Sequence, residues 1–103
     1  MLTLQHPPEL KVRDGAARLT LLLCDPGDWE YSFRATLSEI EQTLAKSAPT
    51  ALTLPSEEPD EDCVEGQLMW GARRFMIYFE HGLGYLEFSS ISLSEIEELR
   101  SAL

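Results

Sequence analysis

The sequence predicts an α+β fold, with one mostly antiparallel sheet of five to seven strands and two helices packed on one of its faces. Three observations support this prediction. Most of the chain alternates apolar and polar residues with a period of two, which is typical of half-buried strands. Short turns that contain glycine or proline separate these stretches and favour antiparallel neighbours. Two other stretches begin with a helix-capping pattern and then space their apolar residues three or four positions apart.

The first third of the chain predicts three strands joined by tight turns. Residues 10–12 lead into Asp14-Gly15, a two-residue hairpin signal, and residues 19–23 continue as a well-buried strand. A second turn is predicted at residues 25–28, because proline presets φ and glycine tolerates a positive φ. Aromatic residues then alternate through residues 29–35, so we expect a third strand there.

Each of the two predicted helices starts from a capping motif. Residues 36–39, Thr-Leu-Ser-Glu, match the capping box and predict a helix over residues 37–47. Residues 92–95 repeat the pattern and predict a second helix that runs close to Leu103. Both starts contain Leu-Ser-Glu-Ile-Glu. Duplication of a strand-and-helix unit and convergence on the same capping chemistry are both compatible with this repeat, and both give the same fold class.

Strands are also predicted through the second half of the chain. A short edge strand is expected at residues 51–54, and an exposed, irregular loop at residues 55–62, which are polar and include two prolines. A strand over residues 64–70 follows, and Gly71-Ala72 suits a type II′ turn.

The next strand, at residues 73–80, is apolar on both faces, which places it centrally in the sheet. A turn at residues 81–84 then leads into a last strand at residues 85–89.

Length and composition indicate one domain, residues 1–103. The hydrophobic fraction of 44% is ordinary for a folded protein. Residues 1–8 lack the features of a signal peptide, and no segment approaches the about 20 apolar residues of a membrane span, so we expect a cytoplasmic protein. Cys24 and Cys63 are expected to be free thiols in that reducing compartment. No cofactor is predicted.

The formal charge of −10 is unevenly distributed. Residues 1–54 carry a net −2, whereas residues 55–103 carry a net −8. Nucleic acids and anionic membranes would repel such a surface, because both are normally bound by clustered lysine and arginine. The charge therefore favours a basic protein as the partner.

The most acidic segment has six carboxylates within nine residues and no intervening base: Glu57, Glu58, Asp60, Glu61, Asp62 and Glu65. One interpretation is a solvated loop that only aids solubility. The other is a recognition element that steers a basic partner onto the protein. The segment begins like a calcium-binding EF-hand loop, but Val64 occupies a ligand position, and Gly66 lies one residue after the position at which that loop requires glycine. No metal site is therefore predicted.

The sequence contains no convincing catalytic constellation. Cys63 is surrounded by carboxylates that favour the neutral thiol, and Cys24 lies in an apolar stretch that predicts burial. No Gly-x-Ser-x-Gly motif is present. His81, next to Glu80, is the histidine best placed for acid–base chemistry, although a polar residue at a hairpin tip is its simpler interpretation. We therefore expect no enzyme.

Three aromatic residues, Trp70, Tyr78 and Tyr85, are candidates for a binding patch. Core packing on the sheet explains most aromatic residues of the chain. The two helices are expected to cover only one sheet face, however, so an exposed patch of these three side chains on the other face is a second interpretation beside core packing, which is favoured for any single one of them. Trp and Tyr concentrate binding energy at interfaces, so such a patch would be functional.

The second half resembles the small immunity proteins of bacterial contact-dependent growth inhibition and polymorphic toxin systems. The similarity lies in Trp70-Gly71, Tyr78-Phe79-Glu80 and residues 84–90, Gly-Tyr-Leu-Glu-Phe-Ser-Ser, followed by a short C-terminal helix. Such proteins bind one cognate toxin domain, often a basic nuclease, and block its active site or substrate surface. The resemblance implies that the loop acids, with Glu80 and Glu87, bind lysine and arginine of a toxin.

The leading hypothesis is thus a cytoplasmic inhibitor, monomeric or weakly dimeric, that binds a basic protein and neutralises a toxin. A chaperone for a secreted effector is the first alternative, and would hold an extended client segment along a sheet edge. A small enzyme that uses His81 with Glu80 is the second.

Overall fold

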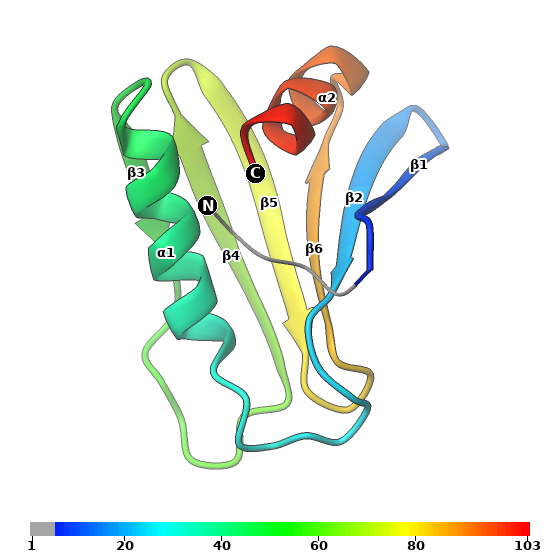
Figure 1. Cartoon of the computed structure of the whole chain (residues 1–103), viewed down its shortest axis with the longest axis vertical. Helices are drawn as coiled ribbons and strands as arrows, with labels where there is room; N and C mark the ends of the chain where they lie inside the picture. The colour runs from blue at the N-terminus through cyan, green and yellow to red at the C-terminus, as the bar shows by residue number, and fades with distance from the viewer. Residues whose placement is uncertain (1–5) are drawn as a thin grey trace.

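A computed structural model describes residues 6–103 of the chain. These residues form one antiparallel sheet with the strand order β1-β2-β6-β5-β4-β3, and both helices lie over the same face of it (Figure 1). The elements are β1 (Glu9–Arg13), β2 (Ala16–Leu22), α1 (Phe33–Ala45), β3 (Thr50–Thr53), β4 (Cys63–Trp70), β5 (Arg73–Glu80), β6 (Tyr85–Ser90) and α2 (Leu93–Ala102). The predicted fold class is confirmed. Residues 1–5, part of the segment expected to lack signal-peptide features, lie outside the described residues.

The hydrophobic core lies between the sheet and the two helices. Two rows of apolar side chains cross the central strands, with Leu19, Phe88 and Ile77 in one row and Leu21, Leu86 and Phe79 in the next. The helices cover these rows with Phe33, Leu37, Ile40 and Leu44 from α1 and Ile96 and Leu99 from α2. Burial of each such side chain contributes about 2 kcal/mol, so this layer supplies most of the stabilisation.

Turn chemistry sets the register of the hairpins as the sequence predicts. Asp14 and Gly15 both adopt positive φ, 53° and 78°, which is the type I′ geometry that matches the twist of two paired strands. Gly71, at φ 60°, begins the turn that joins β4 to β5, in agreement with a type II′ turn. The edge position of β3 and the internal position of β5 are also confirmed.

The predicted third strand at residues 29–35 is wrong. Ser32 caps α1 instead, and its Oγ accepts a hydrogen bond from the Ala35 N–H at 3.1 Å. Helix α1 therefore starts at Phe33, four residues before the predicted start, and ends at Ala45 rather than residue 47. Phe33 lies one helical turn before Leu37, so it extends the apolar stripe of the helix backwards, and its burial there outweighs the local alternation.

The second capping prediction is confirmed. The Ser92 Oγ accepts a hydrogen bond from the Glu95 N–H at 3.3 Å, and α2 runs to Ala102. The repeated Leu-Ser-Glu-Ile-Glu begins at the first residue of α2 but one turn into α1, so the two copies occupy different positions in their helices.

We predict that Gly84→Ala destabilises the protein by about 3 kcal/mol, whereas Gly15→Ala costs about 1 kcal/mol. Both glycines have positive φ, 73° and 78°, so alanine is strained at either position. At Gly84 an added Cβ would also collide with the Cys24 carbonyl oxygen, while nothing lies within 4 Å of a Cβ at Gly15. Urea unfolding of the two variants measures the difference, and equal losses would contradict the steric argument.

Candidate functional site

Three connections meet at one end of the sheet, drawn at the bottom of Figure 1: residues 23–32, 54–62 and 81–84. The β5–β6 turn is hydrogen-bonded to the other two. Its His81 carbonyl accepts from the Gly27 N–H at 3.0 Å, and its His81 N–H donates to the Asp62 carbonyl at 3.0 Å. The Asp62 carboxylate accepts from the Gly82 N–H at 2.8 Å. The predicted loop at residues 55–62 is thus fixed to the sheet at its last residue.

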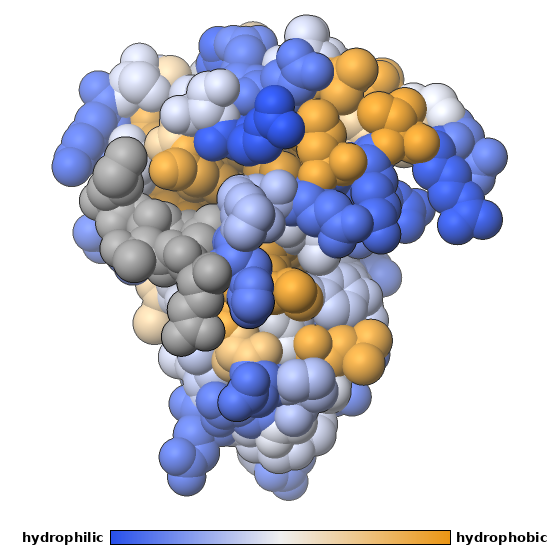
Figure 2. Space-filling view, turned by 45° about the vertical axis from the view of Figure 1, so that its right-hand side comes forward, coloured by the Kyte–Doolittle hydropathy of each residue, from blue (hydrophilic) through white to orange (hydrophobic). Residues whose placement is uncertain are grey.

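We define the acidic end as these three connections together with the first turn of α1. Negative charge is concentrated there. It carries eight carboxylates and the single base Arg34; the acids are Asp25, Asp28, Glu30, Glu57, Glu58, Asp60, Glu61 and Asp62. The other lysine and arginine residues lie on β1, β2, β5 and α2, and directly after α1. Figure 2, in which the acidic end again points down, shows hydrophilic residues over most of this end. The sequence predicted the acidic character of the β3–β4 loop. It did not predict that this loop lies beside the acids of the β2–α1 connection.

Arg34 holds the acidic loop against α1 with three hydrogen bonds. Its Nε and Nη2 donate to the two carboxylate oxygens of Glu61, each at 2.9 Å, and its Nη1 donates to the Pro55 carbonyl at 3.0 Å. The Arg34 guanidinium lowers the pKa of Glu61 below its ordinary value, and Glu61 in turn raises the pKa of Arg34. Glu61, expected to be a free recognition acid, is therefore an anchor of the loop.

The remaining loop acids differ in position. Glu57, Glu58 and Asp60 are exposed, and no salt bridge holds them within residues 6–103. Asp60 adopts a positive φ of 58°, a conformation that Asp and Asn tolerate better than most residues. Glu65 belongs to β4 and lies on the sheet face opposite the helices, away from the other five. Three of the six predicted carboxylates thus remain free at the acidic end.

His81 is part of the core rather than a polar hairpin tip. It is 7% exposed, and its ring stacks on Trp29 and meets Phe33 and Phe79 edge-on. Glu80 points to the opposite side of the sheet, where one carboxylate oxygen accepts from the Cys63 thiol at 3.3 Å. The two residues predicted as a possible acid–base pair are therefore not brought together.

A cavity of about 500 Å³ lies between the β2–α1 connection, the acidic loop and His81. Its walls include Trp29, Tyr31, Arg34, Glu58 and Asp60. Trp29 is 57% exposed, which is unusual for so large an aromatic side chain. Sequence reasoning missed Trp29 and Tyr31 because it assigned both to a strand. The Asp-Pro-Gly-Asp turn immediately before them was the available signal that they follow a loop.

The predicted aromatic patch is only partly present. Tyr78 and Tyr85 are half-buried on the sheet face without helices, with ring centroids 5.8 Å apart. Trp70 is 6% exposed on the other face, because β4 alternation places it with Val64 and Leu68. The Trp70 Nε1–H donates to Ser47 Oγ at 3.1 Å, and the Arg73 guanidinium lies 4.2 Å from its ring centroid. Its predicted membership of an exposed patch is wrong.

The open sheet face places acids beside the tyrosines. Glu87 and Glu65 flank Tyr78 on the neighbouring strands, and Glu80 is paired with Tyr85. The Cys63 thiol and burial raise the pKa of Tyr78, and burial and Glu80 raise the pKa of Tyr85. Both phenols therefore stay neutral and able to donate hydrogen bonds at physiological pH. Glu65, Glu80 and Glu87 form a second acidic group, separate from the cavity.

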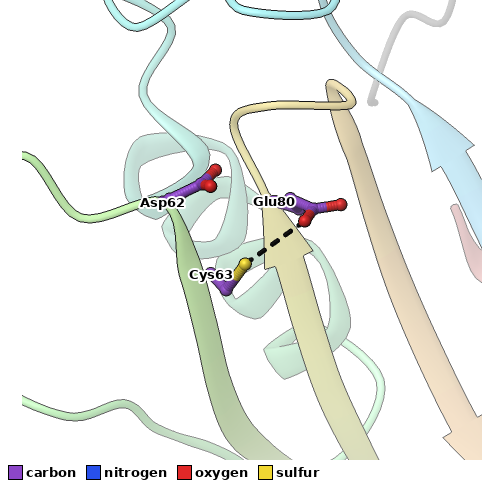
Figure 3. Close-up of side chains that lie close together, drawn as sticks. All are labelled: Asp62, Cys63 and Glu80. Carbon is purple, nitrogen blue, oxygen red and sulfur yellow. Dashed lines mark hydrogen bonds between the residues drawn. The ribbon is translucent and has the colours of Figure 1, made fainter.

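Asp62, Cys63 and Glu80 bring three potential metal-ligand atoms within 4.8 Å of one another (Figure 3). In Figure 3 the Asp62 carboxylate points away from the thiol, and it already accepts the Gly82 N–H. A hydrogen bond with Tyr78 lowers the pKa of Cys63, but burial, Glu80 and Asp62 together outweigh it and the pKa is raised. The raised pKa agrees with the prediction that the carboxylates around Cys63 favour its neutral thiol.

Comparison with known proteins finds no matching family model, no similar curated protein and no similar solved structure. Neither helix within residues 6–103 combines the length and the apolar character that crossing a membrane requires. Both cysteines are free. The function therefore has to be argued from the geometry of this chain alone.

We predict that Glu61→Gln lowers stability by about 1–2 kcal/mol at pH 7 and by almost nothing at about pH 2. The pKa of Glu61 is lower in the folded protein than its ordinary value of 4.5, so the ion pair stabilises the fold above that pH. The contribution is lost as the pH falls through the lowered pKa. Urea unfolding at several pH values measures it.

The control is Glu57→Gln, which makes the same charge change at an exposed residue of the same loop. This substitution should change the free energy of unfolding little, both at pH 7 and at about pH 2. A Glu61→Gln effect that persisted unchanged in acid would show that the ion pair does not cause it.

Proposed function

We propose that this chain is a cytoplasmic protein-binding inhibitor of the immunity-protein type, which neutralises a basic toxin domain by covering its active site or substrate surface. The observation that carries the proposal is the acidic end. Two loops distant in sequence bring eight carboxylates together around an exposed indole, and the one base among them is already occupied by Glu61 and Pro55.

The charge at this end is suited to a basic partner. Like charges gathered on one surface cost stability, so their presence there favours a role in association. A focused negative field raises the association rate of a positively charged protein, and the effect falls as salt screens the charges. Nuclease-like toxin domains present such a positive surface, because they must bind phosphate backbones.

The acidic end is also organised before any partner arrives. Asp62 is hydrogen-bonded to the β5–β6 turn, and Glu61 is bound by Arg34. Association therefore costs less conformational entropy than it would with a mobile acidic loop. Trp29, exposed beside the carboxylates, supplies the large apolar contact that commonly anchors an interface.

A chaperone for a secreted effector remains a second candidate, favoured by one observation. The sheet face without helices exposes Leu22 and Met76, 48% and 45%, near the two half-buried tyrosines. An apolar face of this kind would suit a stable homodimer or an extended client. Light scattering distinguishes the two proposals, since a chaperone of this class would be a concentration-independent dimer. The enzyme alternative has no such support, because Glu80 and His81 lie on opposite sides of the sheet.

We predict that Glu58→Gln/Asp60→Asn slows association with the cognate toxin domain by about fivefold at low ionic strength and flattens its dependence on salt. Both residues are exposed at the acidic end, and Asn keeps the positive φ of residue 60 accessible. The toxin domain is sought among the products of genes adjacent to the gene for this chain. Stopped-flow association and rescue of cells that express the toxin are the two measurements.

The matched control is Glu39→Gln/Glu97→Gln, which removes the same charge from exposed positions on α1 and α2. It should leave the association rate within about twofold of the original value. The proposal fails if no neighbouring gene encodes a toxic product from which this chain protects the cells that express it. It also fails if the two double variants slow association equally.

A further inference from the structure

The cavity at the acidic end offers a distinctive set of polar groups. Part of the donor capacity of its wall is already used, since three of the five Arg34 N–H groups donate to Glu61 and Pro55, and the Tyr31 hydroxyl is hydrogen-bonded to Thr36 Oγ1 at 2.7 Å. Glu57, Glu58 and Asp60 line the same cavity and make no ion pair within the described residues. What the cavity presents to a ligand is therefore mainly hydrogen-bond acceptors.

His81 adds a mostly buried imidazole to the cavity wall. The carbonyl of Asp28 lies 3.4 Å from its Nδ1 and can only accept, so Nδ1 is the donor of this contact. The other ring nitrogen, Nε2, makes no hydrogen bond within residues 6–103. The side chain is 93% buried, yet it forms part of the cavity wall. No buried side-chain nitrogen or oxygen among residues 6–103 lacks a hydrogen-bond partner, so Nε2, which makes no such bond, is accessible to solvent and to a ligand.

Trp29 completes the site with an aromatic surface. Its ring stacks on His81, with centroids 5.6 Å apart and planes 15° apart, while more than half of the side chain remains exposed. An indole is the aromatic group that interacts most strongly with a cation. Carboxylates and an indole together match a flat cation with several N–H donors.

We propose that this cavity binds the guanidinium group of an arginine side chain; the proposal rests on the proposed function in taking that arginine from the basic partner. A guanidinium has five N–H donors in one plane, so it pairs with a carboxylate through two bonds while it stacks on an aromatic ring. A lysine ammonium has three donors on a compact, strongly hydrated group, and it satisfies this arrangement less well. A volume of about 500 Å³ leaves room for the whole side chain.

The probe is a pair of capped tripeptides, acetyl-Gly-Arg-Gly-amide and acetyl-Gly-Lys-Gly-amide, which have the same charge. Each is titrated into the ¹⁵N-labelled protein and followed by NMR at the Trp29 indole N–H and at the backbone amides of Ser32 and Glu58. We expect saturable millimolar binding of the arginine peptide, at least about threefold tighter than that of the lysine peptide.

Two variants test the residues of the site. Trp29→Leu and Glu58→Gln should each weaken binding of the arginine peptide by at least about threefold, as read from the Ser32 amide. Glu97→Gln, with the same charge change on an exposed part of α2, should leave it unchanged. Dispersion of the amide spectrum shows directly that each variant is folded.

Equal affinity for the two peptides, or shifts that never saturate, would overturn the proposal, because a diffuse acidic surface attracts any cation. Equal weakening by Glu58→Gln and Glu97→Gln would overturn it too. These outcomes are separate from the fate of the proposed function. If acid substitutions slow binding of a toxin domain but the peptides bind alike, only the arginine site fails. If the arginine peptide is selected but no toxin partner depends on the acids, only the proposed function fails.

Discussion

The arrangement of the acidic end depends on the β5–β6 turn. Its backbone bonds to both neighbouring connections, through the Asp62 carbonyl on one side and Gly27 on the other. At its far side the Gly84 carbonyl accepts from the Leu23 N–H at 3.0 Å, an approach that glycine permits because a Cβ would collide with the next carbonyl. His81 adds aromatic contacts to Trp29 in the β2–α1 connection and to Phe33 of α1. The turn thus holds two like-charged loops side by side.

Holding these loops together is costly, and specific contacts offset the cost. Mutual repulsion of carboxylates at short range destabilises the folded state. The Arg34–Glu61 pair opposes it with two 2.9 Å hydrogen bonds, and both groups are largely shielded from water, with side chains 21% and 13% exposed. The Asp62 carboxylate is stabilised by a backbone N–H. The remaining acids stay hydrated, where their charge is less costly and is available to a partner.

The sequence predicted those parts of the fold that depend on local chemistry. The hairpin turn at Asp14-Gly15 requires positive φ, which these residue types tolerate. A serine such as Ser92 accepts hydrogen bonds from the free backbone N–H groups at the start of a helix. The prediction failed where tertiary contacts decide. Residues 29–35 alternate like a strand, yet Phe33 gains more by joining the apolar stripe of α1. His81 is polar in isolation, but three aromatic rings surround it. The acids of the β3–β4 loop were evident in sequence, whereas their meeting with Trp29 is a result of topology.

The charge segregation has a consequence for self-association. Two copies that met through their acidic ends would place sixteen carboxylates, twice the eight of one copy, against two arginines that are already engaged. Such a contact is repulsive, so the acidic end disfavours association with the acidic end of a second copy. Any dimer must form elsewhere, on the open sheet face or along an edge strand. The acidic end therefore stays accessible to a positively charged molecule even at high protein concentration.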